Sequence, residues 1–222
     1  MYYLIETQEQ LDRFFKDEGS ECYLQFITNN NETHPKLQSL CALYIYSFSK
    51  EKGFIINLNH PEAFELELPI KYLESYTNIF VKEKTKALLY IPTLPYTDIQ
   101  SIYYLIKNEP LDSLPKTGAH TYYERKYGAY NANKIIPIAK HHEALTQEFD
   151  ALYPYISNFK KEESNKWYNE ILTPTLAKMV SEGFKINPTF KKHFDINEKF
   201  SINENKAYGW YNFCTTTGRP TN

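Results

Sequence analysis

Three consecutive side chains with acid–base or metal-binding chemistry, His141, His142 and Glu143, lie in a segment whose apolar residues recur at helical spacing. Successive residues of a helix point about 100° apart, so the two histidines cannot hold one ion together. Four residues later the chain offers only Thr146 and Gln147, which are weak ligands. We therefore expect a solvated helix face here and no metal site.

Two other segments carry residues that could contact nucleic acid. The first is rich in tyrosine and basic residues, and its candidates for base stacking and phosphate contact are Tyr122, Tyr123, Arg125 and Lys126. A loop whose tyrosines pack on a sheet explains the same composition. In the second segment, lysines alternate with other residues at Lys82, Lys84 and Lys86. We expect these three to form a solvated face of a strand or helix.

The composition of the chain excludes some classes of protein. The chain has 222 residues, which suggests one domain, or one domain with an appendage. Apolar residues make up 42% and charged residues 23%, values that exclude wholesale disorder. The net charge is −2, so a site for a polyanion would have to be a local patch. Aromatic residues, at 16%, are abundant and fit the core of a glycine-poor sheet.

The cysteines and the N-terminal residues indicate the cellular compartment of the protein. Cys22, Cys41 and Cys214 are odd in number and far apart, a pattern typical of a reducing compartment. The first residues lack a basic region followed by an apolar run, so they do not form a signal peptide. No segment approaches the ~18 apolar residues of a membrane span. We expect a cytoplasmic protein with no membrane partner.

The elements that must position the candidate residues begin with one helix and three strands. The helix covers 7–19, with Thr7 as its N-cap, and the strands cover 21–28, 40–48 and 54–59. Short turns join the strands, which predicts an antiparallel meander.

The rest of the chain is mostly helical in pattern. We expect a helix at about 67–74, a strand and a helix within 78–91, and a helix that begins behind Thr97 or Asp98 as its cap. A long amphipathic helix covers 138–156, and another begins near 164, contains Pro174 and ends at Gly183. This order predicts an α/β (α+β) domain that starts with the meander, followed by a helical extension.

Two segments of the C-terminal part carry a recognisable pattern. The first, 169–188, combines an acidic residue, a proline, spaced apolar residues and a glycine, at Glu170, Pro174, Leu176, Val180, Glu182, Gly183 and Ile186. The second, 215–222, reads TTTGRPTN. Together they resemble family A DNA polymerases, the group related to bacterial polymerase one, in its compact phage-type form. The first is similar to the helix after the exonuclease domain, although Asn187 stands where the family has Asp. The second is similar to the T-x-T-G-R-x-[ST] motif that enters the polymerase palm.

This resemblance implies DNA contacts for the second segment. Arg219 would lie in the minor groove of a primer–template duplex, while Thr215 and Thr217 would meet the backbone. The minor groove shows acceptors at every base pair, so an arginine there can check pairing without reading sequence. A surface turn is the structural alternative for the same Gly and Pro residues.

The resemblance also implies a ribonuclease-H-like 3′–5′ exonuclease domain in the first half, in which carboxylates hold two metal ions. The D-x-E pair of the first strand falls on Gln25 and Ile27, and the later ligand positions fall on Leu88 and His142. None of these four side chains is a carboxylate. Asp98 is similar to a family Asp that caps a helix. We therefore predict a degenerate domain with no catalytic residues, no metal and no cofactor.

These inferences combine into one leading hypothesis. Residues 1–160 form the inactive exonuclease-like domain, and 161–222 form a helical lead-in and a truncated start of the polymerase region. The chain would act in DNA replication as a scaffold that helps to position primer–template DNA, with the palm and fingers supplied elsewhere.

Two alternatives stay open. The first is an active exonuclease that uses Mg²⁺ and unusual ligands, with carboxylates drawn from Glu21, Glu32, Asp98 and Glu143. The second is a non-enzymatic module for single-stranded nucleic acid.

Overall fold

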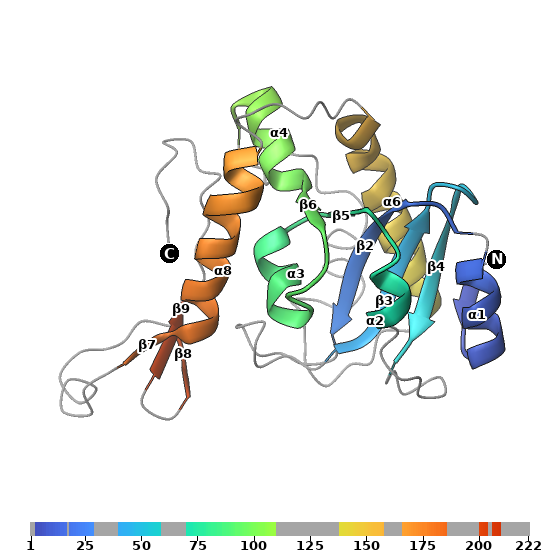
Figure 1. Cartoon of the computed structure of the whole chain (residues 1–222), viewed down its shortest axis with the longest axis horizontal. Coiled ribbons are helices and arrows are strands. Elements are labelled where there is room, and N and C mark those ends of the chain that lie inside the picture. Colours follow the sequence, from blue (N-terminus) through green and yellow to red (C-terminus); the bar gives the residue numbers. More distant parts are fainter. Residues whose placement is uncertain are drawn as a thin grey trace.

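The structure is a computed structural model, shown in Figure 1. It describes residues 3–16, 18–28, 40–58, 70–109, 138–157, 166–185, 200–203 and 206–209. These residues form a six-stranded mixed sheet with helices on both faces, and a smaller three-stranded sheet at the end of helix α8. The α/β architecture that the sequence predicts is confirmed.

The centre of the large sheet is the predicted meander. It consists of β2 (Glu21–Thr28), β3 (Leu40–Ser47) and β4 (Lys52–Asn57), and each pairs antiparallel with the next. The β3–β4 pair is closely packed at Gly53, where a Cβ would collide with the ring of Tyr44.

Parallel strands complete both sides of the meander. β1 (Tyr3–Ile5) pairs with β4, while β5 (Asn78–Val81) pairs with β2 and β6 (Tyr96–Asp98) with β5. The strand order is β1-β4-β3-β2-β5-β6. The sequence pattern predicts β5 but neither β1 nor β6, because a three-residue strand is too short to show a period.

Helices cover the two faces of the sheet and bury separate cores. On one face, α1 (Gln8–Lys16), α2 (Ile70–Leu73) and α3 (Lys84–Tyr90) cover one apolar cluster. On the other, α4 (Ile99–Lys107) and α6 (Ile138–Ser157) cover a second cluster. Figure 1 shows α2 in front of the sheet and α6 behind it. The side chains of α6 that reach the sheet recur at helical spacing, at Ala144, Leu145, Phe149, Leu152 and Ile156.

Two helix caps expected from the sequence are present. The Thr7 hydroxyl accepts a hydrogen bond from the Gln10 amide, and the Gln10 side chain accepts one from the Thr7 amide, which makes a capping box for α1. The Asp98 carboxylate accepts a hydrogen bond from the Ser101 amide at the start of α4.

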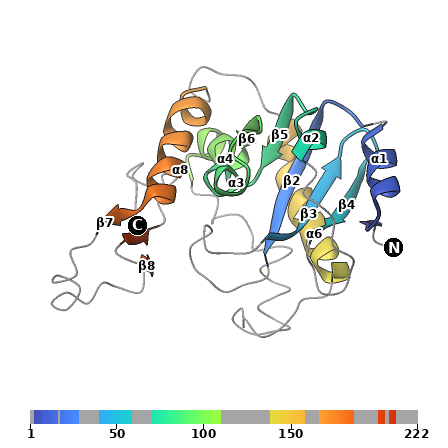
Figure 2. The same ribbon diagram turned by 60° about the horizontal axis from the view of Figure 1, so that its bottom comes forward.

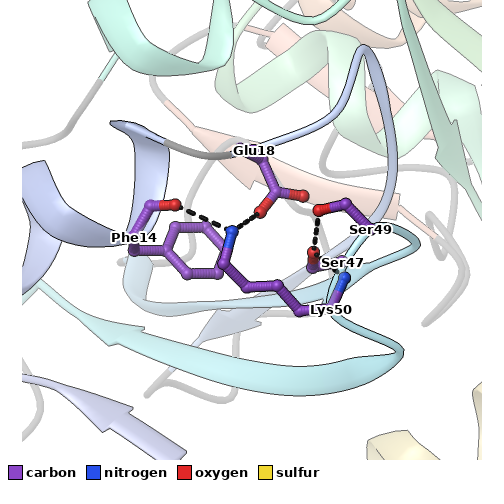
Figure 3. A network of polar contacts seen from close by, with 5 residues as sticks. All are labelled: Phe14, Glu18, Ser47, Ser49 and Lys50. Carbon is purple, nitrogen blue, oxygen red and sulfur yellow. Dashed lines mark hydrogen bonds and ion pairs between the residues drawn. The ribbon is translucent and has the colours of Figure 1, made fainter.

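An ion pair fastens α1 to the turn between β3 and β4 (Figure 3). The Lys50 ammonium donates to Glu18 Oε2 at 2.5 Å and to the Phe14 carbonyl at 3.0 Å. The Lys50 amide donates to the Ser47 hydroxyl, which lies 3.1 Å from that of Ser49. The last turn of α1 is thereby tied to the hairpin, since the Phe14 carbonyl is one of the acceptors that a helix end leaves without a helical partner.

The C-terminal part begins with a π-helical turn, η3 (Tyr168–Leu172), that runs into α8 (Thr173–Glu182). Pro174 lies in the first turn of α8. Gly183 ends the helix with φ at 63°, and a Cβ there would meet the ring of Tyr208 at 2.8 Å. The expected domain boundary at residue 160 lies outside the described residues.

A small sheet follows α8, which the sequence analysis had not foreseen in an extension that it expected to be helical. β7 (Phe184–Lys185), β8 (Phe200–Asn203) and β9 (Lys206–Gly209) form it in the order β7-β9-β8. Figures 1 and 2 both place α8 between this sheet and the large one. The strands are two to four residues long, which explains why periodicity did not reveal them.

Candidate functional site

The candidate site lies where the order of strands in the large sheet reverses. β2 and β5 are neighbours, although β3 and β4 come between them in the chain. The strands that follow β2 in the chain, β3 and β4, lie on one side of it, whereas β5 and β6 lie on the other side. Such a switch point, at the carboxyl ends of parallel strands, is the usual place for a ligand in open α/β sheets. Lys82 directly follows β5 at this place, and the β2–β5 register ends where Leu24 pairs with Val81, one residue before Gln25 and Lys82.

Four polar side chains meet here under α6, and we call them the Glu148 cluster: Tyr23, Gln25, Lys82 and Glu148. The Lys82 ammonium lies 2.7 Å from Glu148 Oε2. The Gln25 amide donates to Glu148 Oε1 at 2.6 Å and to the Tyr23 hydroxyl at 2.7 Å. The Tyr23 hydroxyl in turn donates to Glu148 Oε1 at 3.3 Å. Both carboxylate oxygens of Glu148 are therefore engaged.

The side chains of this ion pair are largely removed from water, which makes their hydrogen bonds important for stability. The Glu148 side chain is 11% exposed and that of Lys82 is 32% exposed. A carboxylate removed from water needs a cation and hydrogen-bond donors, and Lys82, Gln25 and Tyr23 supply them. Burial raises the pKa of Tyr23 well above its ordinary value, and the nearby Glu148 charge raises it further, so this phenol remains a hydrogen-bond donor.

Lys86, in the first turn of α3, lies in the electrostatic range of the cluster. Burial lowers the pKa of Lys86, the charge of Glu83 opposes this shift, Lys82 adds to it, and Glu148 opposes it. With the residues that the structure describes, Lys86 forms no hydrogen bond or ion pair. The expectation of a solvated lysine face was therefore wrong. Lys82 pairs with Glu148, Lys84 donates to the carbonyl of Asn169 at 2.7 Å, and Lys86 is partly buried.

The donor set of the Glu148 cluster differs from the one that the two metal ions implied by the exonuclease resemblance would need. Glu148 is the one carboxylate of the cluster, and an ammonium group lies against it. Across the described part of the chain, no three His, Cys, Asp or Glu residues come together in a way that could hold a metal ion. Hard divalent cations need several oxygen ligands, so these residues do not fit a metal pair.

Asp98 is a buried carboxylate outside the Glu148 cluster, and its hydrogen bonds join elements of the fold. It is 1% exposed, and its carboxylate accepts hydrogen bonds from the Lys84 amide and from the amide and hydroxyl of Ser101. Burial raises its pKa, and the hydrogen bonds, led by that of Ser101, oppose the shift. The Asp98 amide donates to the Asn169 side chain at 2.8 Å, which ties η3 to the large sheet.

The four predicted exonuclease positions do not come together as one group. Gln25 belongs to the Glu148 cluster, and Ile27 is buried in the apolar core on the same face. Leu88 packs into the core on the opposite face. His142 lies over β3 and β4, where its Nε2 is 2.8 Å from the carbonyl oxygen of Gly53. That these positions correspond to family ligand positions stays a prediction.

The structure also places some of the other candidates. Glu21, at the start of β2, accepts a hydrogen bond from Asn78 at 3.4 Å, and Glu143 pairs with Lys140 on the exposed side of α6. His141 is buried, so the expected solvated face of α6 was wrong at this residue. The remaining candidates lie outside the described residues: Glu32, Tyr122, Tyr123, Arg125, Lys126, Thr215, Thr217 and Arg219.

Glu148 is a functional candidate that no motif in the sequence indicates. Its signal was an acidic residue on the apolar face of a helix, because Ala144, Leu145 and Leu152 lie three or four residues away and all are buried. A charge at such a position must find a partner, and the partner is Lys82.

Comparisons with known proteins agree with this architecture. No model of a known protein family matches the chain, and no curated protein sequence matches it. Among solved structures, RNase D from Trypanosoma brucei is 12% identical, with a TM-score of 0.51 over 79% of this chain and 72% of that one. Its GMP complex gives a TM-score of 0.52.

Escherichia coli RNase D, an exoribonuclease involved in structured RNA processing, is 14% identical, with a TM-score of 0.48. The match covers 80% of this chain, which spans about half of the E. coli protein, 51% of its length. In the part of the chain that the structure describes, no helix is long and apolar enough to cross a membrane. The mixed sheet, its helices and the likeness to T. brucei RNase D give the chain a ribonuclease-H-like fold of the 3′–5′ exonuclease kind.

Proposed function

We propose that this chain is a non-catalytic 3′–5′ exonuclease-like domain that serves as a scaffold. The observation that carries the proposal is the pairing of Glu148 with Lys82 and Gln25 at the switch point of the sheet. A lysine ammonium and an amide occupy both oxygens of the one carboxylate in the cluster. Metal-assisted phosphodiester hydrolysis requires a set of oxygen ligands that this cluster does not supply.

The wider context that we propose is the N-terminal part of a family A DNA polymerase. The support is the resemblance of two segments, 169–188 and 215–222, to that family. The helix α8, with its early Pro174 and terminal Gly183, has the form that the first segment predicts. In this proposal Thr215, Thr217 and Arg219 contact primer–template DNA, and the palm and fingers belong to another segment.

An active exonuclease is the second candidate, and the likeness to T. brucei RNase D favours it. Glu148 would then be a metal ligand, and Lys82 would have to leave it when the metal binds.

One experiment separates the two candidates. The purified chain is incubated with 5′-labelled single-stranded DNA and RNA of twelve nucleotides, in Mg²⁺ and in Mn²⁺, and the product lengths are resolved on a gel. We expect no shortening of either substrate. Stepwise shortening that EDTA stops and that Glu148→Gln abolishes would establish the active exonuclease, because a contaminating nuclease would not respond to that substitution.

A further inference from the structure

Helix α8 and the π-helical turn before it carry a stripe of exposed apolar side chains. Trp167 is 48% exposed, Ile171 56% and Met179 40%, and Thr175 between them is exposed as well. These positions are four residues apart, which is close to one helical turn, so they follow one side of the helix. The stripe holds three of the eight large apolar side chains that are exposed in the described part of the chain. Apolar groups that gather on one exposed face make that face a candidate interaction surface.

The other side of the same helix attaches it to the domain. Thr173, Leu176, Ala177 and Val180 are buried, at the spacing of a stripe that faces a core. α8 packs against α3, and Figures 1 and 2 both place α8 on the side of α3 away from β2, β3 and β4. The exposed stripe therefore has no part in holding α8 to α3.

Charged residues flank the apolar stripe in a symmetric order. The side chains of Lys166 and Glu170 lie 4.0 Å apart, and those of Lys178 and Glu182 lie 3.9 Å apart. All four are largely exposed, so these pairs are weak and free to exchange partners. In the sequence, Lys166 and Glu182 are each eight residues from Pro174, and Glu170 and Lys178 are each four residues from it. Each lysine thus has a glutamate at the equivalent position on the other side of Pro174.

This order makes the charges of the face complementary to themselves. If two copies of the helix pack antiparallel about a two-fold axis near Pro174, Lys166 of one copy lies opposite Glu182 of the other. Glu170 then lies opposite Lys178 of the other copy. A parallel pairing in register would bring like charges together, which is unfavourable. The charges therefore select an antiparallel pair.

The apolar stripe has nearly the same centre of symmetry. Residue 173, one position before Pro174, lies midway between Trp167 and Met179 and also between Ile171 and Thr175. The antiparallel pair that matches the charges therefore places the apolar residues of one copy against those of the other, so one arrangement satisfies both patterns.

We propose that this chain forms a homodimer through the exposed face of α8, with the two helices antiparallel. A two-fold interface uses one patch on both subunits, so it requires a patch that is complementary to itself. The inference is independent of the proposed function, because no residue of this face belongs to the Glu148 cluster. Residues 166–182 span about 25 Å as a helix. Such a contact is smaller than a standard interface, so we expect a weak dimer with a Kd of about 10 µM.

The first test is sedimentation velocity of the full chain at low salt, from about 1 µM to about 200 µM, a range that brackets the expected Kd. Ile171→Asp introduces a charge in the middle of the stripe and should raise the Kd at least about thirtyfold. Ile70→Asp is the matched control, since it makes the same substitution at an exposed isoleucine of α2. It should leave the Kd unchanged within error.

A charge-reversal experiment tests the orientation of the two helices. Lys166→Glu and Glu182→Lys each place like charges opposite one another twice in a dimer, and each should raise the Kd about tenfold. An equimolar mixture of the two variants should dimerise as tightly as the wild type, because the mixed dimer contains two pairs of opposite charge. A variant that fails to fold cannot be rescued by mixing, and circular dichroism of each variant alone checks its structure.

Three results would overturn the inference. The first is a chain that stays monomeric at the highest concentration, which would leave the face to a different partner. The second is an Ile171→Asp variant that dimerises as the wild type does, which would assign the dimer to another surface. The third is a mixture of the charge variants that associates no more tightly than either variant alone, which would contradict the antiparallel pairing.

Discussion

Two glutamate–lysine pairs lie on opposite faces of the large sheet, and they differ in what surrounds them. In the first, Glu18 is 2% exposed and Lys50 26% exposed; in the second, Glu148 is 11% exposed and Lys82 32% exposed. Lys50 also donates to the Phe14 carbonyl and lies 4.7 Å from the centre of the Phe14 ring. Lys82 has Glu148 as its partner, and the nearby Lys86 forms no ion pair with the residues that the structure describes.

The difference shows how the same ion pair can serve the fold or a site. The Glu18–Lys50 pair joins a helix end to a turn, and its lysine has several partners. The Glu148–Lys82 pair lies at the switch point, where its lysine is more exposed and donates to Glu148 alone among the described residues. We therefore expect substitutions at the first pair to cost more unfolding free energy than substitutions at the second.

The largest effect on stability should follow removal of Lys50. Lys50→Ala leaves the buried Glu18 carboxylate without a cation, and Glu18 Oε1 already lacks a hydrogen-bond partner. An uncompensated buried charge of this kind costs about 3 kcal/mol of unfolding free energy. Urea denaturation measures it. Arg13→Ala, which breaks the exposed pair with Glu9, is the control and should leave the midpoint within error. Equal midpoints for both variants would refute the fastening role of Lys50.

A smaller loss is expected at the second pair. Lys82→Ala leaves Glu148 with the Gln25 and Tyr23 donors and with partial access to water. The cost in unfolding free energy should be about 1.5 kcal/mol, at the low end of the range for a hydrogen bond to a charged group. The same urea titration gives the value. A loss of unfolding free energy as large as that of Lys50→Ala would mean that both ion pairs stabilise the fold equally.

The smallest effect should have the opposite sign. Because its pKa is lowered, Lys86 binds its proton less tightly in the folded chain than in the unfolded one, so the charged form costs stability below the lowered pKa. That cost disappears as the pH rises through the lowered pKa toward the ordinary value of 10.5. Lys86→Met should therefore stabilise the chain by about 0.5 kcal/mol at pH 7, and the gain should shrink toward pH 10. Melting curves at several pH values measure it, and a destabilised variant at pH 7 would contradict the prediction.

The sequence predicted the elements that have a clear period or cap. The meander of β2, β3 and β4 follows from three apolar runs with short turns, and the start of α4 follows from Asp98 as its cap. α6 follows from the helical spacing of its buried residues. The strands β7, β8 and β9 were not predicted, because they are too short to show a period.

The residues of the candidate site were harder to predict from the sequence than the elements of the fold. Motif spacing singled out Gln25, but it could not show that Lys82 and Glu148 would join it, since 66 residues separate that pair. Only the topology brings the end of β5 under α6. The lysines at 82, 84 and 86 looked like a solvated face because alternation does not reveal which neighbours a helix will meet.

The central claim is that the Glu148 cluster is not a site for divalent metal ions, and its most direct test is a titration with Mn²⁺. The free ion is followed by electron paramagnetic resonance, in parallel for the wild-type chain and Glu148→Gln. We predict that the two proteins leave the same amount of Mn²⁺ free at every concentration. Micromolar binding of one or two ions by the wild type that Glu148→Gln abolishes would contradict the claim.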